Sequence, residues 1–136
     1  MPDNAKGNSP EAAAHFVEYY IELLNYASAT GDVEPLESRS ANSCKGCSNY
    51  IKLYRETYEN GGYFKDSVWT PRAPVPYKQG SKCTVLVSIH ATDGAYVLRK
   101  GKPEQKGRGG IYALRFELHY RDGDWKVSVF ERQAET

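Results

Sequence analysis

A β-hairpin near the end of the chain is predicted by the stretch YRDGDWKV, residues 120–127. Asp-Gly is a favoured dipeptide for the two-residue turn that joins antiparallel strands. A turn at Asp122-Gly123 puts three pairs of side chains on one face of the hairpin: Tyr120 with Trp125, Leu118 with Val127, and Phe116 with Val129. Since a slip of one residue would move Trp125 into water, this face is predicted to be core and the register to be well specified.

The residues before this hairpin also favour an antiparallel sheet, because apolar and polar side chains alternate along them. The predicted strands are a short edge strand over 63–69, longer strands over Lys82–Ala91 and 111–120, and an extended stretch over 95–100. Residues 70–76 contain three prolines, which cannot donate hydrogen bonds to a sheet ladder. They are therefore predicted to form an extended connector outside the sheet.

Helical periodicity precedes the sheet. Pro10–Thr30 follows a serine cap, repeats apolar residues at helical spacing and ends at a glycine suited to a left-handed cap. A short second helix is predicted after Asp32, and a third over residues 44–60 with Ser43 as its cap. The predicted class is therefore α+β, with three N-terminal helices packed on a curved antiparallel sheet.

The length of 136 residues and the ordinary composition indicate one globular domain, which we place at residues 10–132. Residues 1–9 are small and polar and are predicted to be a flexible tether. A formal net charge of +1 argues against a nucleic-acid partner. No apolar run reaches the ~18 residues of a membrane-spanning helix, and residues 1–9 lack the apolar segment of a signal peptide.

Two parts of the chain resemble known families. Helices followed by a twisted sheet whose last hairpin reads Asp-Gly-Asp-Trp-Lys-Val, at residues 122–127, resemble the cone-shaped fold of the nuclear transport factor 2-like superfamily. The helical half resembles a family of actinobacterial lipoproteins of unknown function in the residues Phe16, Tyr19-Tyr20, Leu24-Asn25-Tyr26-Ala27, Thr30-Gly31-Asp32, Leu36, Cys44 and Cys47.

The lipoprotein resemblance implies an extracytoplasmic domain tethered to the membrane by a lipid anchor, and it implies no known reaction. In that family a signal peptide and a lipidated cysteine precede the tether. Residues 1–136 contain neither feature, which is expected only if the sequence has been trimmed at its N-terminal side. The superfamily resemblance also implies that the chain can form a homodimer through a face of its sheet.

Cys44 and Cys47 form a Cys-Lys-Gly-Cys motif at the start of the third predicted helix, and several interpretations are open. In an oxidising compartment they would form a structural disulfide, which is our leading interpretation, because a three-residue offset at a helix start can bring two sulfurs together. Otherwise they would be free thiols or a redox pair, although a redox pair is typical of a strand–helix–strand unit. A zinc site needs four ligands, and only Cys83 and three scattered histidines remain. Hence no metal or cofactor is predicted.

Domains of the cone-shaped superfamily often enclose a pocket between the sheet and the first helix. The candidates for its wall here are aromatic side chains, namely Phe16, Tyr20, Tyr54, Tyr112, Phe116 and Trp125. A proton-transfer enzyme, of the ketosteroid isomerase or polyketide cyclase type, would need a carboxylate or histidine there with a pKa moved towards neutrality. None of the inward positions is acidic, so no catalytic residue is predicted and this enzyme remains the alternative function.

A basic loop carries five cations against a single acid, Glu104; the cations are Arg99, Lys100, Lys102, Lys106 and Arg108. It is interpreted either as a solvated loop or as a contact for anionic lipid headgroups, wall polymer or an acidic partner. We therefore predict a non-catalytic binding or accessory domain outside the cytoplasm, with an unidentified protein or small molecule as its partner.

Overall fold

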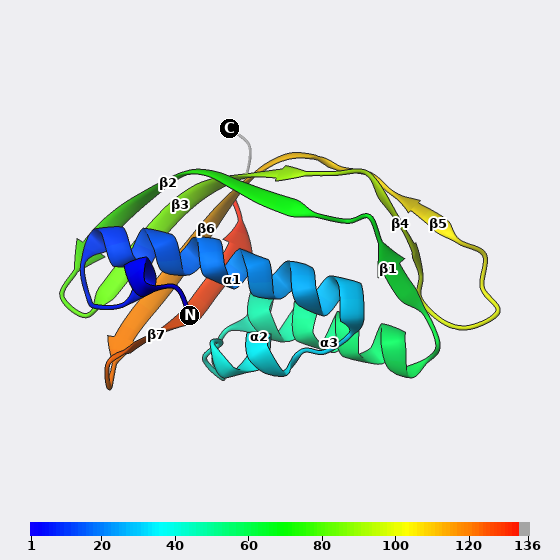
Figure 1. Cartoon of the computed structure of the whole chain (residues 1–136), viewed down its shortest axis with the longest axis horizontal. Helices are drawn as coiled ribbons and strands as arrows, with labels where there is room; N and C mark the ends of the chain where they lie inside the picture. The colour runs from blue at the N-terminus through cyan, green and yellow to red at the C-terminus, as the bar shows by residue number, and fades with distance from the viewer. Residues whose placement is uncertain (134–136) are drawn as a thin grey trace.

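Helices form the first half of the chain and strands the second, as predicted for an α+β fold (Figure 1). The computed structural model describes residues 1–133. Within that range the helical elements are a short 3₁₀ turn, η1 (Asp3–Ala5), and three α-helices, α1 (Pro10–Thr30), α2 (Glu34–Ser38) and α3 (Lys45–Glu59). The strands are β1 (Tyr63–Lys65), β2 (Trp69–Gln79), β3 (Lys82–Ala91), β4 (Gly94–Val97), β5 (Gln105–Gly107), β6 (Gly110–Arg121) and β7 (Asp124–Arg132).

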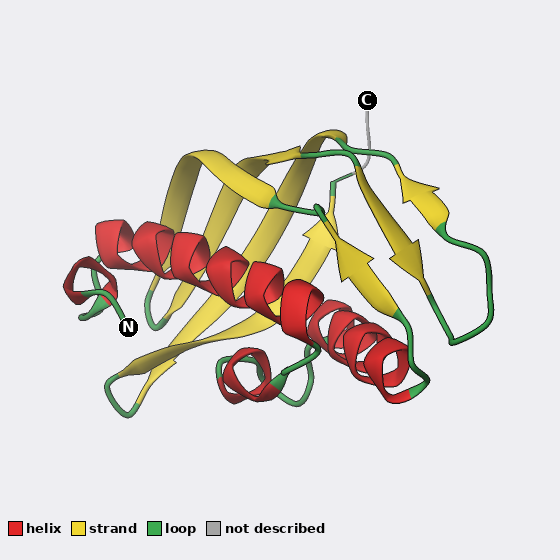
Figure 2. Cartoon of the chain, turned by 45° about the vertical axis from the view of Figure 1, so that its right-hand side comes forward, coloured by secondary structure: helices red, strands yellow, loops and turns green. Residues whose placement is uncertain are grey.

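The strands pair into two antiparallel sheets, one with the order β2-β3-β6-β7 and the other with the order β1-β4-β5. Figure 2 shows the larger sheet curving around α1, which lies along its concave side, and the smaller sheet at one end of the molecule. The helix α1 packs on β1, β2 and β3, whereas α3 packs on β7. The core therefore lies between the curved sheet and the helices.

The helix α1 begins and ends as the sequence predicts. The Ser9 hydroxyl oxygen accepts a hydrogen bond of 3.0 Å from the Ala12 N–H, which satisfies one of the free donors of the first turn. At the other end Gly31 has a φ of 78° and its N–H donates to the Ala27 carbonyl. Glycine adopts this left-handed conformation without the steric cost that other residues bear.

The prediction of a connector over residues 70–76 was wrong, because these residues lie inside β2. The strand pairs with β3 from Trp69 to Gln79, with an irregularity between Arg72 and Val75. At that irregularity Ala73 has a positive φ of 50°. The prolines are tolerated because β2 is an edge strand, which needs ladder donors on one side only.

The final hairpin has the predicted turn and two of the three predicted pairs, Tyr120 with Trp125 and Leu118 with Val127. The third pair was wrong, since the register shifts between Glu117 and Leu118 and brings Phe116 opposite Phe130 rather than Val129. Such a shift is a β-bulge, which reverses the facing of the residues beyond it. Phe130, rather than Val129, is consequently a buried core residue.

Two residues of the segment 1–9, which the sequence predicts to be a flexible tether, contact the domain. Ala5 in η1 is fully buried and belongs to the core. The Gly7 carbonyl accepts a hydrogen bond of 2.9 Å from the indole N–H of Trp125. A buried indole needs such an acceptor, and the segment before α1 supplies it.

The core is continuous from η1 to α3 and includes 24 buried residues. None of the helices within residues 1–133 is long and apolar enough to cross a membrane.

Candidate functional site

A cavity of about 330 Å³ opens at the end of the core where β2, β3, β6 and β7 meet α3. Its walls come from these elements and from the loops beside β2 and β5. The lining residues are Tyr50, Ser67, Trp69, Ile89, Ala91, Thr92, Gly107, Arg108, Tyr112, Leu114, Phe130, Glu131 and Arg132.

Three aromatic rings form the inner part of this cavity. Tyr50 stacks on Phe130 with ring centroids 5.3 Å apart, and Trp69 meets both rings edge-on at 5.6 and 6.3 Å. Contacts of this kind are favourable beyond the apolar area that they bury. They give the cavity an apolar aromatic wall suited to a planar or apolar group.

Trp69 is held in place by Asn25 of α1. The Asn25 side chain donates to the Trp69 carbonyl and accepts from the Trp69 N–H, both at 2.9 Å. Trp69 is the first residue of β2, so these two bonds fix where the edge strand starts relative to α1. Asn25 therefore acts as a positioning residue for the cavity wall without lining it.

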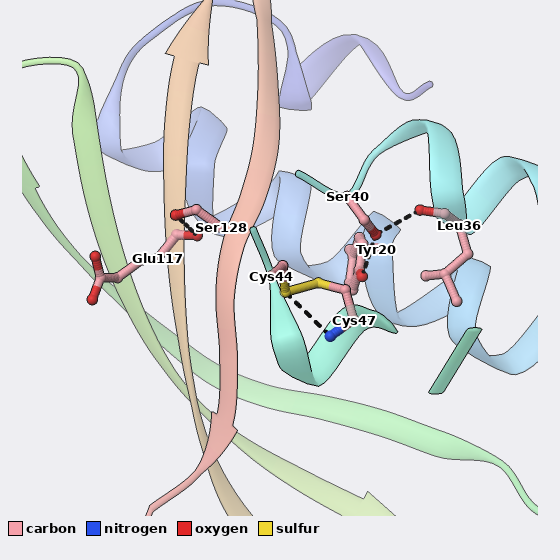
Figure 3. Close-up of a disulfide and its surroundings, with 7 residues drawn as sticks. All are labelled: Tyr20, Leu36, Ser40, Cys44, Cys47, Glu117 and Ser128. Atoms are coloured by element: carbon pink, nitrogen blue, oxygen red, sulfur yellow. Dashed lines mark hydrogen bonds between the residues drawn. A yellow bond between two sulfur atoms is a disulfide. The ribbon is translucent and has the colours of Figure 1, made fainter. Parts of the chain in front are cut away.

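Phe130 and Tyr50 are positioned by the start of α3. Cys44 and Cys47 form a disulfide, with Cα atoms 5.3 Å apart, and both are fully buried. Figure 3 shows this disulfide between β7 and the loop that follows α2. A Cβ atom at Gly46 would lie 1.9 Å from the Phe130 carbonyl oxygen, so only glycine lets α3 approach β7 this closely.

The disulfide confirms our leading interpretation of the Cys-Lys-Gly-Cys motif and corrects the predicted cap of α3. Cys44 rather than Ser43 is the N-cap, because its sulfur accepts a hydrogen bond of 3.2 Å from the Cys47 N–H. Cys83 is a free, fully buried cysteine on β3, and burial raises the pKa of its thiol. Within residues 1–133 no group of histidine, cysteine or acidic side chains is arranged to hold a metal ion.

Two arginines stand at the mouth of the cavity. The Arg132 guanidinium carbon lies 4.4 Å from the centroid of the Tyr112 ring, a cation–π arrangement. The Tyr112 hydroxyl donates to the Arg108 carbonyl at 3.2 Å, which ties the loop after β5 to β6. Among the described residues, neither Arg108 nor Arg132 forms an ion pair with a carboxylate. Their charges are thus free to attract an anionic group.

Tyr50 offers a hydroxyl at the aromatic wall of the cavity. Burial raises the pKa of Tyr50, so the phenol stays protonated at neutral pH and can donate a hydrogen bond. Among the described residues, none forms a hydrogen bond with this hydroxyl. Every buried side-chain polar atom among them does have a partner, so the unpartnered Tyr50 hydroxyl is not itself buried. The Tyr50 hydroxyl therefore keeps access to the cavity space.

The predicted pocket residues are mostly core rather than cavity wall. Phe16, Tyr20, Phe116 and Trp125 are fully buried, and Tyr54 is 7% exposed. They are packed together between α1, α3 and the sheet, where large aromatic rings fill the space that the resemblance assigned to a pocket. Of the predicted set, Tyr112 alone lines the cavity described above.

The predicted basic loop is divided between two places. Arg108 lines the cavity, while Arg99 and Lys102 line a separate hollow between α3 and the smaller sheet. Lys100 follows β4, and Lys106 lies in β5, a short strand within the stretch predicted to be loop. The structure therefore does not bring the five cations together at one site.

The sequence analysis did not single out several residues that line the cavity, notably Tyr50, Trp69, Phe130 and Arg132. It also missed Asn25, which positions Trp69. Phe130 was missed because the predicted hairpin pairing contained no bulge. A polar side chain in the middle of a predicted helix was the one usable signal for Asn25, since buried polar side chains require partners.

Solved structures with this architecture show the fold. The intermembrane space region of the chloroplast protein ARC6 is similar with a TM-score of 0.70 and 13% identity, over 93% of this chain and 98% of that one. A nuclear transport factor 2-like protein from Cytophaga hutchinsonii is similar with a TM-score of 0.61 and 18% identity, over 89% and 97% of the two chains.

A third similar structure comes from Novosphingobium aromaticivorans, and its name assigns it provisionally to the scytalone dehydratases. The TM-score is 0.58 and the identity 14%, over 92% of this chain and 85% of that one. At such identities these likenesses establish the nuclear transport factor 2-like fold and carry no activity with them.

In sequence, the model of a family of unknown function, DUF6318, matches residues 1–131. A search of curated proteins finds no match.

Proposed function

Since the chain belongs to this family of unknown function, DUF6318, we propose a function from its own geometry: it is a non-catalytic binding domain whose cavity holds a small planar or apolar molecule bearing an anionic group. The observation that carries this proposal is the pairing of an aromatic wall with two arginines that have no carboxylate partner among residues 1–133. Concave sites lined by apolar side chains with a few polar groups are the usual form of small-molecule sites.

The two parts of the cavity would recognise the two parts of such a ligand. The rings of Tyr50, Trp69 and Phe130 would cover its apolar body. Arg132 and Arg108 would bind its anionic group, because guanidinium groups form charge-assisted hydrogen bonds with carboxylates. The Tyr50 hydroxyl would donate one further hydrogen bond.

The alternative, a proton-transfer enzyme, finds less support in this cavity. Its reaction would need a carboxylate or histidine beside the substrate. The only carboxylate that lines the cavity within residues 1–133 is Glu131, which pairs with Arg115 at 3.1 Å and is more than half exposed. Neither His90 nor His119 lines the cavity, and His15 is bonded to Glu18 at 2.8 Å on α1.

We further propose that the domain works outside the cytoplasm. The buried Cys44–Cys47 disulfide supports this location, because disulfides persist mainly in oxidising compartments. The resemblance to actinobacterial lipoproteins extends the proposal to a domain held at the membrane by a lipid anchor. Mass spectrometry of the native protein, isolated from the organism that makes it, would show a lipidated N-terminal cysteine if this extension is right and an unmodified chain if it is wrong.

The ligand class is tested with naphthoate, an aromatic carboxylate, and with naphthamide, its neutral counterpart. Quenching of tryptophan fluorescence and calorimetric titration would measure binding of both probes to the whole chain. We expect naphthoate to bind at least about tenfold more tightly than naphthamide, because a charge-assisted hydrogen bond contributes about 1.5–3 kcal/mol.

Substitution of the cavity arginine supplies the control. Arg132→Gln is expected to remove most of the preference for naphthoate and to leave the binding of naphthamide nearly unchanged. Arg72→Gln, at an exposed arginine of β2 that does not line the cavity, removes the same charge and should preserve the preference. Equal affinities of the wild-type chain for the two probes, or equal effects of the two substitutions, would contradict the proposed ligand class.

A further inference from the structure

The hairpin formed by β4 and β5 carries a positive charge that its own acid does not neutralise. Glu104, the single acid of the loop, is bonded to the Tyr63 hydroxyl and lies 3.2 Å from the Lys65 ammonium nitrogen, both on β1. These two donors lower the pKa of Glu104, so it stays ionised and committed to β1. Glu104 therefore does not form an ion pair with the cations on either side of it in the sequence.

Four cations of this hairpin consequently lack a carboxylate partner within the described part of the chain. All four side chains are exposed, and they are Arg99, Lys100, Lys102 and Lys106. We call them the hairpin cations. Figures 1 and 2 show that the hairpin forms one end of the molecule, away from the curved sheet, so the hairpin cations are presented together at that end.

An apolar hollow of about 650 Å³ lies beside the hairpin cations, between α3 and the smaller sheet. Its apolar lining includes Leu53, Tyr96, Leu98 and Pro103. Two of these side chains are unusually exposed to solvent for leucine: Leu98 is 49% exposed and Leu53 is 38% exposed. Exposed apolar residues that gather in a hollow rimmed by charge are typical of a contact with another molecule or a lipid surface.

The backbone holds this arrangement in shape. The Lys100 N–H donates to the Asn60 carbonyl at 2.9 Å, which joins the hairpin to the end of α3. A Cβ atom at Gly62 would lie 2.0 Å from the Val97 carbonyl oxygen, so the glycine after α3 allows this close approach. These contacts hold the segment that carries Leu98 and the hairpin cations against the end of α3.

We infer that this end of the molecule docks on an anionic lipid surface, with Leu98 entering the interface and the hairpin cations facing the headgroups. Charge complementarity selects this occupant, because exposed lysines and arginines around an exposed leucine match a negatively charged bilayer with an apolar interior. Glu56, the one carboxylate that lines the hollow among residues 1–133, is outnumbered there by Arg99 and Lys102. The inference uses none of the residues of the cavity and stands apart from the ligand proposed for it.

Sedimentation with vesicles tests this inference on the whole chain. We expect binding to vesicles containing roughly 30% phosphatidylglycerol in phosphatidylcholine, and little binding to pure phosphatidylcholine. Each basic residue near an anionic surface contributes about fivefold in affinity, so replacing all four hairpin cations by glutamine should weaken binding at least about a hundredfold. Leu98→Ala should weaken it by roughly tenfold, since the leucine would no longer be buried in the interface.

A matched set of four substitutions outside the β4–β5 hairpin is the control. Lys45→Gln, Lys78→Gln, Arg121→Gln and Lys126→Gln remove the same charge from exposed residues that form no ion pair among the described residues. This control should bind the anionic vesicles within about fivefold of the wild-type chain, and circular dichroism should show that both sets fold.

Three results would overturn the inference. They are no excess binding to the anionic vesicles, equal losses in the two sets of four, and competition by soluble polyglutamate that is unaffected by Leu98→Ala. The last result would assign the surface to an acidic polymer. Because naphthoate binding uses Arg132, it would be unchanged in all of these outcomes, so failure here is distinguishable from failure of the proposed cavity function.

Discussion

The aromatic core has a closed end around Tyr20 and Trp125 and an open end around Tyr50 and Trp69, which line the cavity. The same residue types have different surroundings at the two ends. At the closed end Tyr20 is fully buried and its hydroxyl is 2.7 Å from Ser40 Oγ, which donates in turn to the Leu36 carbonyl, as Figure 3 shows. At the open end Tyr50 is half-buried and its hydroxyl faces the cavity. Burial raises the pKa of both phenols, so the difference between them lies in their hydrogen bonds and not in their charge.

The two tryptophans of the chain repeat this contrast. Trp125 is 1% exposed, lies edge-on to Tyr120 at 5.0 Å and donates to Gly7, whereas Trp69 is partly exposed and lines the cavity. The closed end is covered by η1, the first half of α1 and the loop after α2. The open end is bordered by Arg108 of the loop after β5 and by Arg132 at the end of β7. The aromatic cluster is therefore closed core at the end that η1 and α1 cover, and it borders a cavity, the proposed ligand site, at the other end.

The largest expected effect comes from comparing Trp125→Ala with Trp69→Ala. Trp125→Ala should lower the free energy of unfolding by about 3–5 kcal/mol, because it leaves a large internal cavity and an unpaired Gly7 carbonyl. Trp69→Ala should cost only about 1–2 kcal/mol, since its ring already borders open space and its backbone bonds to Asn25 remain. Urea denaturation followed by circular dichroism measures both losses.

Similar losses for the two variants would break the comparison and show that both ends are equally packed. An unchanged dependence of the unfolding free energy on urea concentration is required of each variant, so that the losses refer to the same unfolded state.

The disulfide gives the next largest effect, because it is fully buried and fixes the start of α3 against β7. Replacing Cys44 and Cys47 by alanine removes a bridge that closes a short loop, and should cost roughly 2 kcal/mol. Naphthoate affinity should fall as well, since the start of α3 positions Phe130 through the contact at Gly46. Urea denaturation and calorimetric titration measure these two effects.

A reductant supplies the control for this prediction. Dithiothreitol should destabilise the wild-type chain by a similar amount and should leave the double alanine variant unchanged. Destabilisation of both proteins by the reductant would show that it acts elsewhere than on this bridge.

Most of the closed end could be predicted from the sequence, because local rules govern it. Helical spacing identified Phe16 and Tyr20 as inward, and the Asp122-Gly123 turn identified Trp125. Each of these predictions depends on residues close together in the chain. The fold class and the order of helices before strands followed from the same periodicities, whereas η1, β2 and β5 did not.

The open end could not be predicted, because it depends on contacts between distant segments. The facing of Phe130 is set by a one-residue bulge, and a proline-rich edge strand reads as a connector until its partner is known. The bonds of Asn25 to Trp69 join residues 44 positions apart. A site built from such distant contacts has no local sequence pattern by which it could be predicted.

The smallest expected effects come from Tyr20→Phe and Tyr50→Phe, which remove only a hydroxyl group at each end. Tyr20→Phe should lower the free energy of unfolding by about 1 kcal/mol, because the buried Ser40 oxygen loses its partner. Tyr50→Phe should change it by less than about 0.5 kcal/mol, because its hydroxyl bonds to no other described residue.

Ligand binding should show the opposite order, which makes this pair of variants the sharpest test of the comparison. Tyr50→Phe is expected to weaken naphthoate by about fivefold, the effect of losing one hydrogen bond, while Tyr20→Phe leaves the affinity unchanged. Calorimetric titration of both variants at neutral pH measures this, because burial raises the pKa of Tyr20 and Tyr50 and keeps both hydroxyls of the wild-type chain protonated there. A loss of affinity in Tyr20→Phe equal to that in Tyr50→Phe would mean that the closed end also contacts the ligand, and that the division of the aromatic core drawn from the structure is not functional.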